Sequence, residues 1–212
     1  QAAVQRTHDI TKMSFAALGN LLDRYALLRS GAALGNGCGP LVVSRPGRSL
    51  TDAAGRQPTV AIPGMGTTAY HLFRFFMADR FPETDFTVQP MSFEKIMPAV
   101  ADHTADFGLI IHEGRFVYPA LGLERIADLG QWWEDKTELP IPLGCIAVRR
   151  DMDPETACHI QTLIRHSIDH AFAHPDQGAD YIYSGDKPVP FMLPNGLKEI
   201  VDYSCWLEAS SR

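Results

Sequence analysis

The residue best suited to chemistry is a histidine at the end of an apolar run. His112 follows residues 108–111 (Gly-Leu-Ile-Ile), which are predicted to form a buried strand. An imidazole gains and loses a proton near neutral pH, so it can act as a general base, and the apolar run is expected to shield it from water. A core histidine bonded to backbone is an equal alternative. Strand alternation points Glu113 to the opposite face, as a salt-bridge or solvent residue.

Polar residues also lie at two points where a predicted strand gives way to a helix. The first point is Lys12-Met13-Ser14, and the second is Gly64-Met65-Gly66-Thr67-Thr68-Ala69. The free N–H groups and the dipole of a helix start attract anions such as carboxylates. Two such starts in one small sheet indicate a shared anion site. The alternative is that Ser14 and Thr67 only cap their helices.

Metal binding is a weaker interpretation of the histidines. Four of them share one side of a predicted helix: His159, His166, His170 and His174. The His166–His170 spacing suits two metal ligands, but no cysteine or carboxylate pair completes a tetrahedral shell, so no metal is expected. The cysteines at positions 38, 145, 158 and 205 are far apart, which predicts free thiols in a reducing compartment, the cytoplasm.

Apolar stretches alternate with amphipathic ones along the chain, as in α/β proteins. Strands are predicted at residues 8–13, 40–44, 59–62, 84–91, 106–111 and 143–149, and helices at 14–28, 67–80, 92–102, 131–136 and 154–174. Asp153 is the expected N-cap of the last helix. Its expected buried stripe is Ala157, Ile160, Ile164, Ile168 and Ala171.

Composition and charge narrow the classes of molecule that the chain is expected to bind. The chain has 212 residues, a net charge of −6 and 45% hydrophobic residues. A mildly acidic chain without basic runs argues against nucleic acid or an anionic membrane surface as a partner. Its apolar runs are too short to span a bilayer. Together with the anion site predicted at the two helix starts, this makes a small-molecule carboxylate the expected ligand. The oligomeric state is left open.

Several segments together resemble the 1,4-dihydroxy-6-naphthoate synthase family of the futalosine route to menaquinone. The matching segments are residues 9–15, 28–35, 60–64, 67–70, 108–116, 127–133 and 139–144. The resemblance covers roughly residues 7–183, and its most specific part is Ile-Ile-His-Glu-Gly-Arg-Phe at residues 110–116.

The resemblance implies a two-lobe α/β fold of the type II periplasmic-binding-protein kind. Its lobes would comprise residues 1–43 with 147–212, and residues 44–146. The implied activity is a lyase that converts cyclic dehypoxanthinylfutalosine to 1,4-dihydroxy-6-naphthoate without metal or organic cofactor. His112 is then the proton acceptor. Lys12, Met13 and Ser14 form one side of the substrate site, and Thr68 and Ala69 the other.

Two differences from the family and two alternative functions remain. An early strand of the family has no counterpart here, so the chain is expected to be N-terminally truncated relative to it. The sequence from Ser184 onward also departs from the family. The alternatives are a solute-binding protein of a transporter, which shares the fold, and the related chorismate dehydratase of the same pathway. The His112–Glu113 block favours the synthase over the dehydratase.

Overall fold

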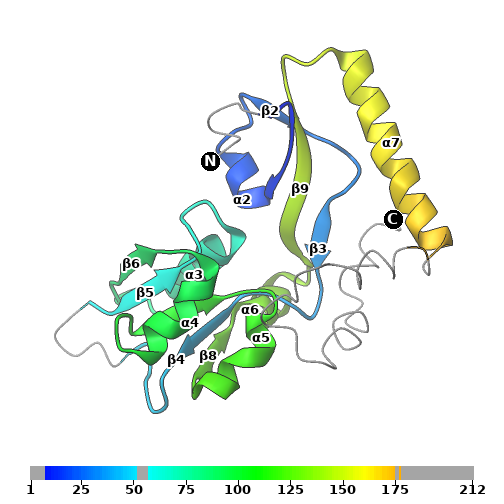
Figure 1. The fold of residues 1–212 in the computed structure, drawn as a ribbon. Helices are drawn as coiled ribbons and strands as arrows, with labels where there is room; N and C mark the ends of the chain where they lie inside the picture. Colours follow the sequence, from blue (N-terminus) through cyan, green and yellow to red (C-terminus); the bar gives the residue numbers. More distant parts are fainter. Residues whose placement is uncertain (1–7, 52–56, 175–176, 178–212) are drawn as a thin grey trace. The chain divides into compact units, whose positions relative to one another are not determined.

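The computed structural model describes residues 8–51, 57–174 and 177. The chain folds as two units, Gln1–Leu34 with Leu143–Arg212, and Gly35–Pro142. Figure 1 shows the order of the elements along the chain. None of the helices in the described ranges is both long and apolar enough to cross a membrane. The sequence predictions for Cys205 and for the segment from Ser184 onward lie outside the described residues.

A five-stranded sheet forms the centre of the unit at residues 35–142. Its order is β6-β5-β7-β4-β8, with β5 parallel to β6 and β7, and β4 antiparallel to β7 and β8. The strands are β4 (Leu41–Ser44), β5 (Thr59–Ile62), β6 (Thr87–Pro90), β7 (Phe107–Ile110) and β8 (Glu124–Asp128). The mixed sheet confirms the predicted α/β class, and β5 has the predicted limits.

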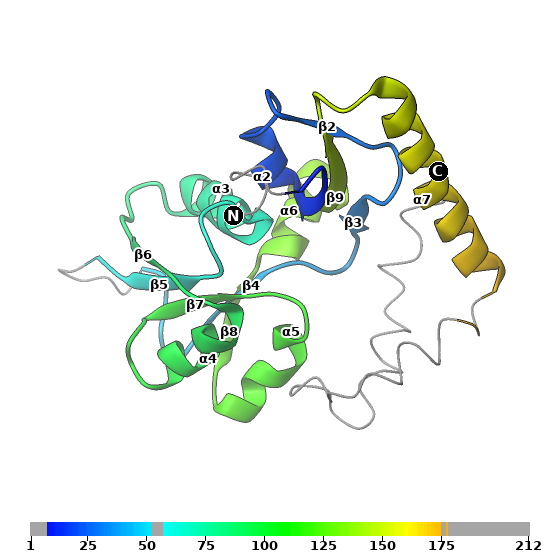
Figure 2. The same ribbon diagram turned by 45° about the horizontal axis from the view of Figure 1, so that its top comes forward.

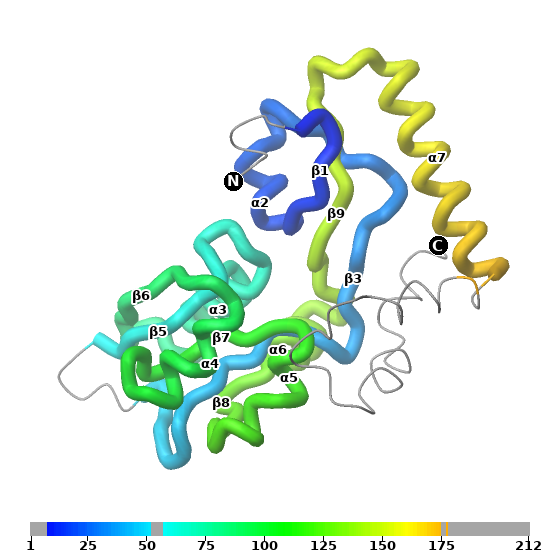
Figure 3. The backbone as a smooth tube through the Cα atoms, in the orientation of Figure 1, coloured from blue at the N-terminus to red at the C-terminus, as the bar shows by residue number. Residues whose placement is uncertain are grey.

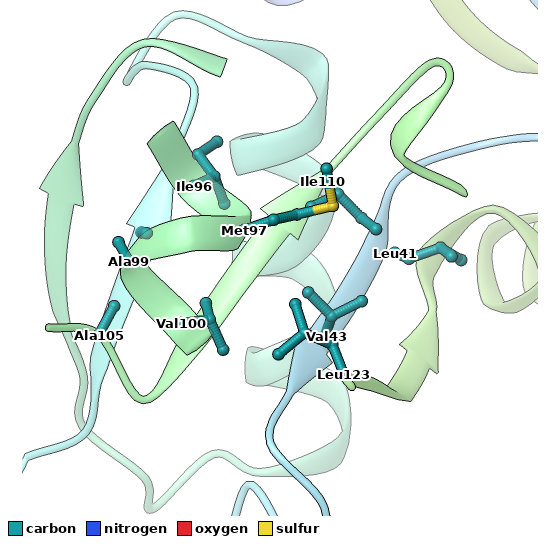
Figure 4. Close-up of a cluster of buried hydrophobic side chains, with 10 residues drawn as sticks. Leu41, Val43, Ile96, Met97, Ala99, Val100, Ala105, Ile110 and Leu123 are labelled. Carbon is teal, nitrogen blue, oxygen red and sulfur yellow. The ribbon is translucent and has the colours of Figure 1, made fainter. Parts of the chain in front are cut away.

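Helices cover both faces of this sheet (Figure 2). On one face α4 (Phe93–Ala101) packs Ile96 and Val100 against inward-facing residues of β4, β5 and β7 (Figure 4). Gly108 of β7 makes this close approach possible, because a Cβ there would lie 2.8 Å from Ile96 Cγ2 and 2.9 Å from Val100 Cγ2. The other face carries α3 (Thr68–Arg80) and α6 (Leu129–Thr137). Alternate strand residues thus serve two helical layers.

A carboxylate joins α3 to α6. Asp79 Oδ2 accepts a hydrogen bond from Trp132 Nε1 at 3.0 Å, and Lys136 Nζ bonds to Asp79 Oδ1. These two bonds, the one from Lys136 first, hold the pKa of Asp79 below its ordinary value. A lowered pKa stabilises the fold above the ordinary carboxyl pKa, and this contribution is lost as the pH falls through the lowered value.

We therefore expect Asp79→Asn to lower stability at neutral pH, where the wild-type carboxylate is charged in both the folded and the unfolded state. The difference between the two proteins should shrink as the medium is acidified below the ordinary aspartate pKa. Urea unfolding midpoints measured from pH 7 to pH 3 test this. A difference that stays constant over that range would contradict the assigned linkage.

The second unit is organised around β9 (Ile141–Arg149). Strands β1 (Ile10–Ser14) and β2 (Tyr25–Leu27) pair with it in antiparallel fashion on its two sides, and β3 (Ala33–Gly35) also pairs with it. Figure 3 shows β1 running beside β9. Leu18 and Leu21 form a small core with three residues of this sheet, Tyr25, Cys145 and Ala147.

The predicted helix at residues 14–28 is wrong beyond its first turn. Helix α2 covers only Phe15–Gly19 and ends at Asn20, whose N–H bonds back to Ala17 O at 3.2 Å. Leu22, which would lie on the apolar face of a helix over residues 14–28, is 52% exposed. Tyr25 is fully buried in β2, and its hydroxyl donates to His8 O at 2.9 Å. Pairing with β9 and burial of Tyr25 therefore override the helical pattern.

Helix α7 (Pro154–Ala173) has the predicted start but not the predicted burial. The carboxylate of Asp153 accepts from Thr156 N at 2.9 Å, as an N-cap should. No residue of α7 is buried, and the expected buried stripe is half-buried at best, with Ala171 exposed. Among the described residues, the turn at Gly31 is one of its neighbours. A Cβ placed on Gly31 would lie 3.4 Å from Cγ2 of Ile164, a residue of α7.

Candidate functional site

The candidate site lies at one edge of the five-stranded sheet. Strands β5, β6 and β7 are parallel, so their carboxyl ends meet at the same edge. Ile62 pairs with Pro90, and Met91 N donates to Ile62 O at 2.9 Å just beyond the last pair. Helices α3, α4 and α5 (Gly114–Val117) begin beyond these three strand ends. The N-termini of these helices therefore lie at the same edge of the sheet.

His112 stands at this edge, two residues after β7. Its backbone adopts the left-handed conformation, with φ of +51°, which ends the strand and starts the turn into α5. The ring meets that of Phe93, the first residue of α4, edge to face with 6.1 Å between centroids. The imidazole is exposed, so the expectation that the apolar strand shields it from water is wrong. The left-handed turn carries His112 out of the sheet, while residues 107–110 stay buried.

Thr67 begins the helix after β5. Its hydroxyl accepts from Tyr70 N at 3.3 Å and donates to Gly64 O at 2.8 Å, so Thr67 is the N-cap of α3. Thr68 Oγ1 donates to Pro142 O at 3.3 Å. Ala69 is buried at 3% exposure, which leaves its side chain to packing. Gly64 has φ of +144°, a conformation that favours glycine in this turn.

We expect Thr67→Val to reduce the free energy of unfolding by about 1 kcal/mol, because it removes the hydroxyl that caps α3 while keeping a branched side chain. Thr67→Ser keeps the hydroxyl and is the matched control. Urea unfolding of the three proteins at neutral pH checks this. Equal midpoints for Thr67→Val and wild type would show that the cap contributes nothing.

Lys12, Met13 and Ser14 belong to β1, in the other unit. They pair with Ile146, Cys145 and Gly144 of β9. Lys12 is exposed, Met13 is half-buried, and Ser14 Oγ accepts from Ala17 N at 2.9 Å as the N-cap of α2. Burial raises the pKa of the Cys145 thiol, which favours the neutral form of this cysteine.

Of the sequence-predicted residues, the structure therefore places His112 and Thr67–Ala69 at one edge of one sheet. His112 contacts Phe93, whereas Thr67 bonds to Gly64 and Tyr70. Lys12–Ser14 lie at the end of a strand of the separate unit. Glu113 is half-buried at the N-cap position of α5.

The histidines of α7 form an exposed face. His170 and His174 stack with 4.2 Å between ring centroids, and His170 Nε2 lies 3.0 Å from Gln177 Oε1. Within residues 8–51, 57–174 and 177, no three histidine, cysteine or acidic side chains gather in a way that could hold a metal ion.

Sequence reasoning missed an ion pair beside the site. Arg115 Nη2 donates to Asp128 Oδ2 at 2.8 Å, and Asp128 Oδ1 caps α6 by accepting from Gly130 N at 3.0 Å. An aspartate directly before a helix is a recognisable cap signal. Its pairing with Arg115 depends on the order of β7, β4 and β8 in the sheet, which local sequence does not encode.

Comparisons with known proteins agree on a family. A family model described as menaquinone biosynthesis matches residues 1–199. Two curated relatives, from Streptomyces coelicolor and Thermus thermophilus, are named 1,4-dihydroxy-6-naphtoate synthase; they are 44% and 42% identical over 174 residues. Each match covers 82% of this chain and 60% of the relative. The chain thus spans about three fifths of the length of these relatives.

Solved structures agree on the fold. Protein AF1704 from Archaeoglobus fulgidus is 32% identical with a TM-score of 0.78, over 98% of this chain and 72% of that chain. The Candida albicans CA3427 product, described as having the generic periplasmic binding protein fold, is 14% identical with a TM-score of 0.63, over 95% of this chain and 66% of that chain. The second likeness confirms the predicted periplasmic-binding-protein-like fold.

Proposed function

The chain belongs to the menaquinone biosynthesis family, and from this membership we propose that it carries out the lyase step that forms 1,4-dihydroxy-6-naphthoate from cyclic dehypoxanthinylfutalosine. The names of the two curated relatives support this activity. The observation that carries the proposal in this chain is the place of His112, an exposed imidazole on a left-handed turn at the carboxyl edge of three parallel strands.

In the proposed reaction, His112 is the general base. The imidazole takes a proton from a C–H bond of the substrate, and the released electron pair starts the cleavage into the naphthoate and a small sugar-derived fragment. Formation of an aromatic ring in the product makes the cleavage favourable. The protein then has to supply a base that is held close to this C–H bond. A fixed turn such as the one that carries His112 suits this role.

Each unit has its own proposed substrate contacts. The start of α3, at Thr67, Thr68 and Ala69, carries the positive end of the helix dipole, which suits a carboxylate or hydroxyl oxygen. Lys12 brings a positive charge to the middle of β1, directly before Met13 and two residues before Ser14. A carboxylate substrate is therefore compatible with the overall charge of −6, because these local groups would bind it.

Incubating the full-length protein with cyclic dehypoxanthinylfutalosine tests the proposal, with 1,4-dihydroxy-6-naphthoate followed by liquid chromatography and mass spectrometry. We expect catalytic formation of the naphthoate. Binding of the substrate without turnover would instead support a solute-binding protein. Parallel samples with the chorismate dehydratase substrate cover the related enzyme, and turnover of that substrate alone would overturn the proposal.

A further inference from the structure

One arginine connects the turn that carries His112 to two other strands. Arg115 N donates to His112 O at 3.2 Å, so the residue belongs to the same turn. Its guanidinium donates to both oxygens of Asp128, at 2.8 Å from Nη2 and 3.4 Å from Nη1, and Nη1 also donates to Gly39 O at 2.6 Å. We call Arg115, Asp128 and Gly39 the Arg115 clamp.

The clamp joins three parts of the sheet edge. Gly39 lies just before β4, Asp128 ends β8 and caps α6, and Arg115 follows β7. Both charged side chains are largely buried, with 19% of Arg115 and 17% of Asp128 exposed. A bidentate arginine–carboxylate pair that is largely buried fixes the orientation of the two side chains as well as the distance between them.

The His112 turn needs this support. Helix α5 has only four residues, Gly114–Val117, and a helix of one turn is not stable by itself. The backbone of His112 is also in a left-handed conformation, which is less favourable than the right-handed one for a residue with a Cβ and so benefits from support by its surroundings. Both terminal guanidinium nitrogens bond within the protein, which suits an internal role better than a substrate contact.

We propose that Arg115 is a positioning residue: through the clamp it holds the His112 turn so that the imidazole stays where the reaction needs it. The kinetic part of this inference rests on the proposed lyase function. The structural part does not, because it concerns the order of the His112 turn in the protein without substrate.

Two substitutions loosen the clamp in different ways. Arg115→Lys keeps the positive charge but cannot form the bidentate pair with Asp128. Asp128→Asn removes the negative charge but keeps a good N-cap for α6. For each we expect kcat to fall by about 10- to 100-fold with KM nearly unchanged, because a displacement of the base by about 1 Å has this size of effect. Adding Arg115→Lys to His112→Asn should cost no further activity.

The His112 ring signal in the NMR spectrum of the substrate-free full-length protein supplies the second readout. It is assigned by its disappearance in His112→Asn, and we expect it to shift and broaden in Arg115→Lys and in Asp128→Asn. The matched control is Arg48→Lys, which weakens the pair between Arg48 and the buried Asp106 (2.8 Å) at the opposite edge of the sheet. That variant should lose stability while keeping kcat and the His112 signal.

The outcomes separate the two claims. An unchanged His112 signal and wild-type kcat in both clamp variants would overturn the positioning role. An equal loss of activity with and without His112 would also overturn it, because Arg115 would then not act through the histidine. If the wild type makes no naphthoate but the His112 signal still changes in both clamp variants, the positioning role stands and the proposed function falls.

Discussion

Replacing His112 with asparagine should lower kcat for naphthoate formation by about 10²–10⁴-fold, the usual loss when a general base is removed. Asparagine is the most informative substitution because, like histidine, it tolerates the left-handed backbone found at this position. Its amide cannot take up the proton. Since the imidazole is exposed, stability should change little, and substrate should still bind. Steady-state kinetics of the full-length protein, with binding measured by calorimetry, provide the test.

The chain offers a matched control for this substitution. His103 is a second exposed histidine in the same unit with a left-handed backbone, with φ of +70°, and it follows α4 at the opposite edge of the sheet. His103→Asn should leave kcat and KM unchanged. Wild-type turnover by His112→Asn, or an equal loss in both variants, would remove His112 from the mechanism.

Gly130→Ala is expected to destabilise the unit at residues 35–142 by about 3 kcal/mol. A Cβ at position 130 would lie 2.3 Å from Cys38 O and 3.0 Å from Gly39 Cα. These neighbours are backbone atoms, so the start of α6 and the segment before β4 have to move apart. The movement would also pull Asp128 from Gly39 and weaken the Arg115 clamp, so activity should fall as well.

Urea unfolding measures this loss, and Gly19→Ala is the control. Gly19 ends α2 and has nothing within 4 Å of a Cβ position, so alanine should be accepted there with unchanged or slightly higher stability. Identical unfolding midpoints for Gly130→Ala and the wild type would show that the close backbone contact at Cys38 is unimportant.

The sequence pattern alone predicted the elements that are marked by an apolar run or by an N-cap residue. The run Thr59–Ile62 became β5 with the same limits, and Thr67 and Asp153 cap α3 and α7 as their residue types indicate. These signals lie within a few residues of one another, so they need no knowledge of the fold. The resemblance to a family was also visible in short segments, and the family model confirms it.

Features that depend on distant partners could not be predicted in this way. Tyr25 forms a strand because β9, more than a hundred residues later, pairs with it, and this pairing ends the predicted helix at residues 14–28. The exposure of His112 comes from a single left-handed residue, and Arg115 finds Asp128 only because the sheet order brings β7 and β8 to either side of β4. The roles of His112, Lys12 and Thr67 in binding or catalysis remain predictions.

The most direct test of the proposed role of His112 is a single-turnover experiment. Full-length wild-type protein and His112→Asn are each mixed in excess with cyclic dehypoxanthinylfutalosine, and 1,4-dihydroxy-6-naphthoate is measured over time by mass spectrometry. We expect the wild type to convert all bound substrate while His112→Asn binds it and yields only a trace in the same period. Equal conversion by the two proteins, or bound substrate left unchanged by the wild type, would contradict the assignment of His112 as the base of a lyase.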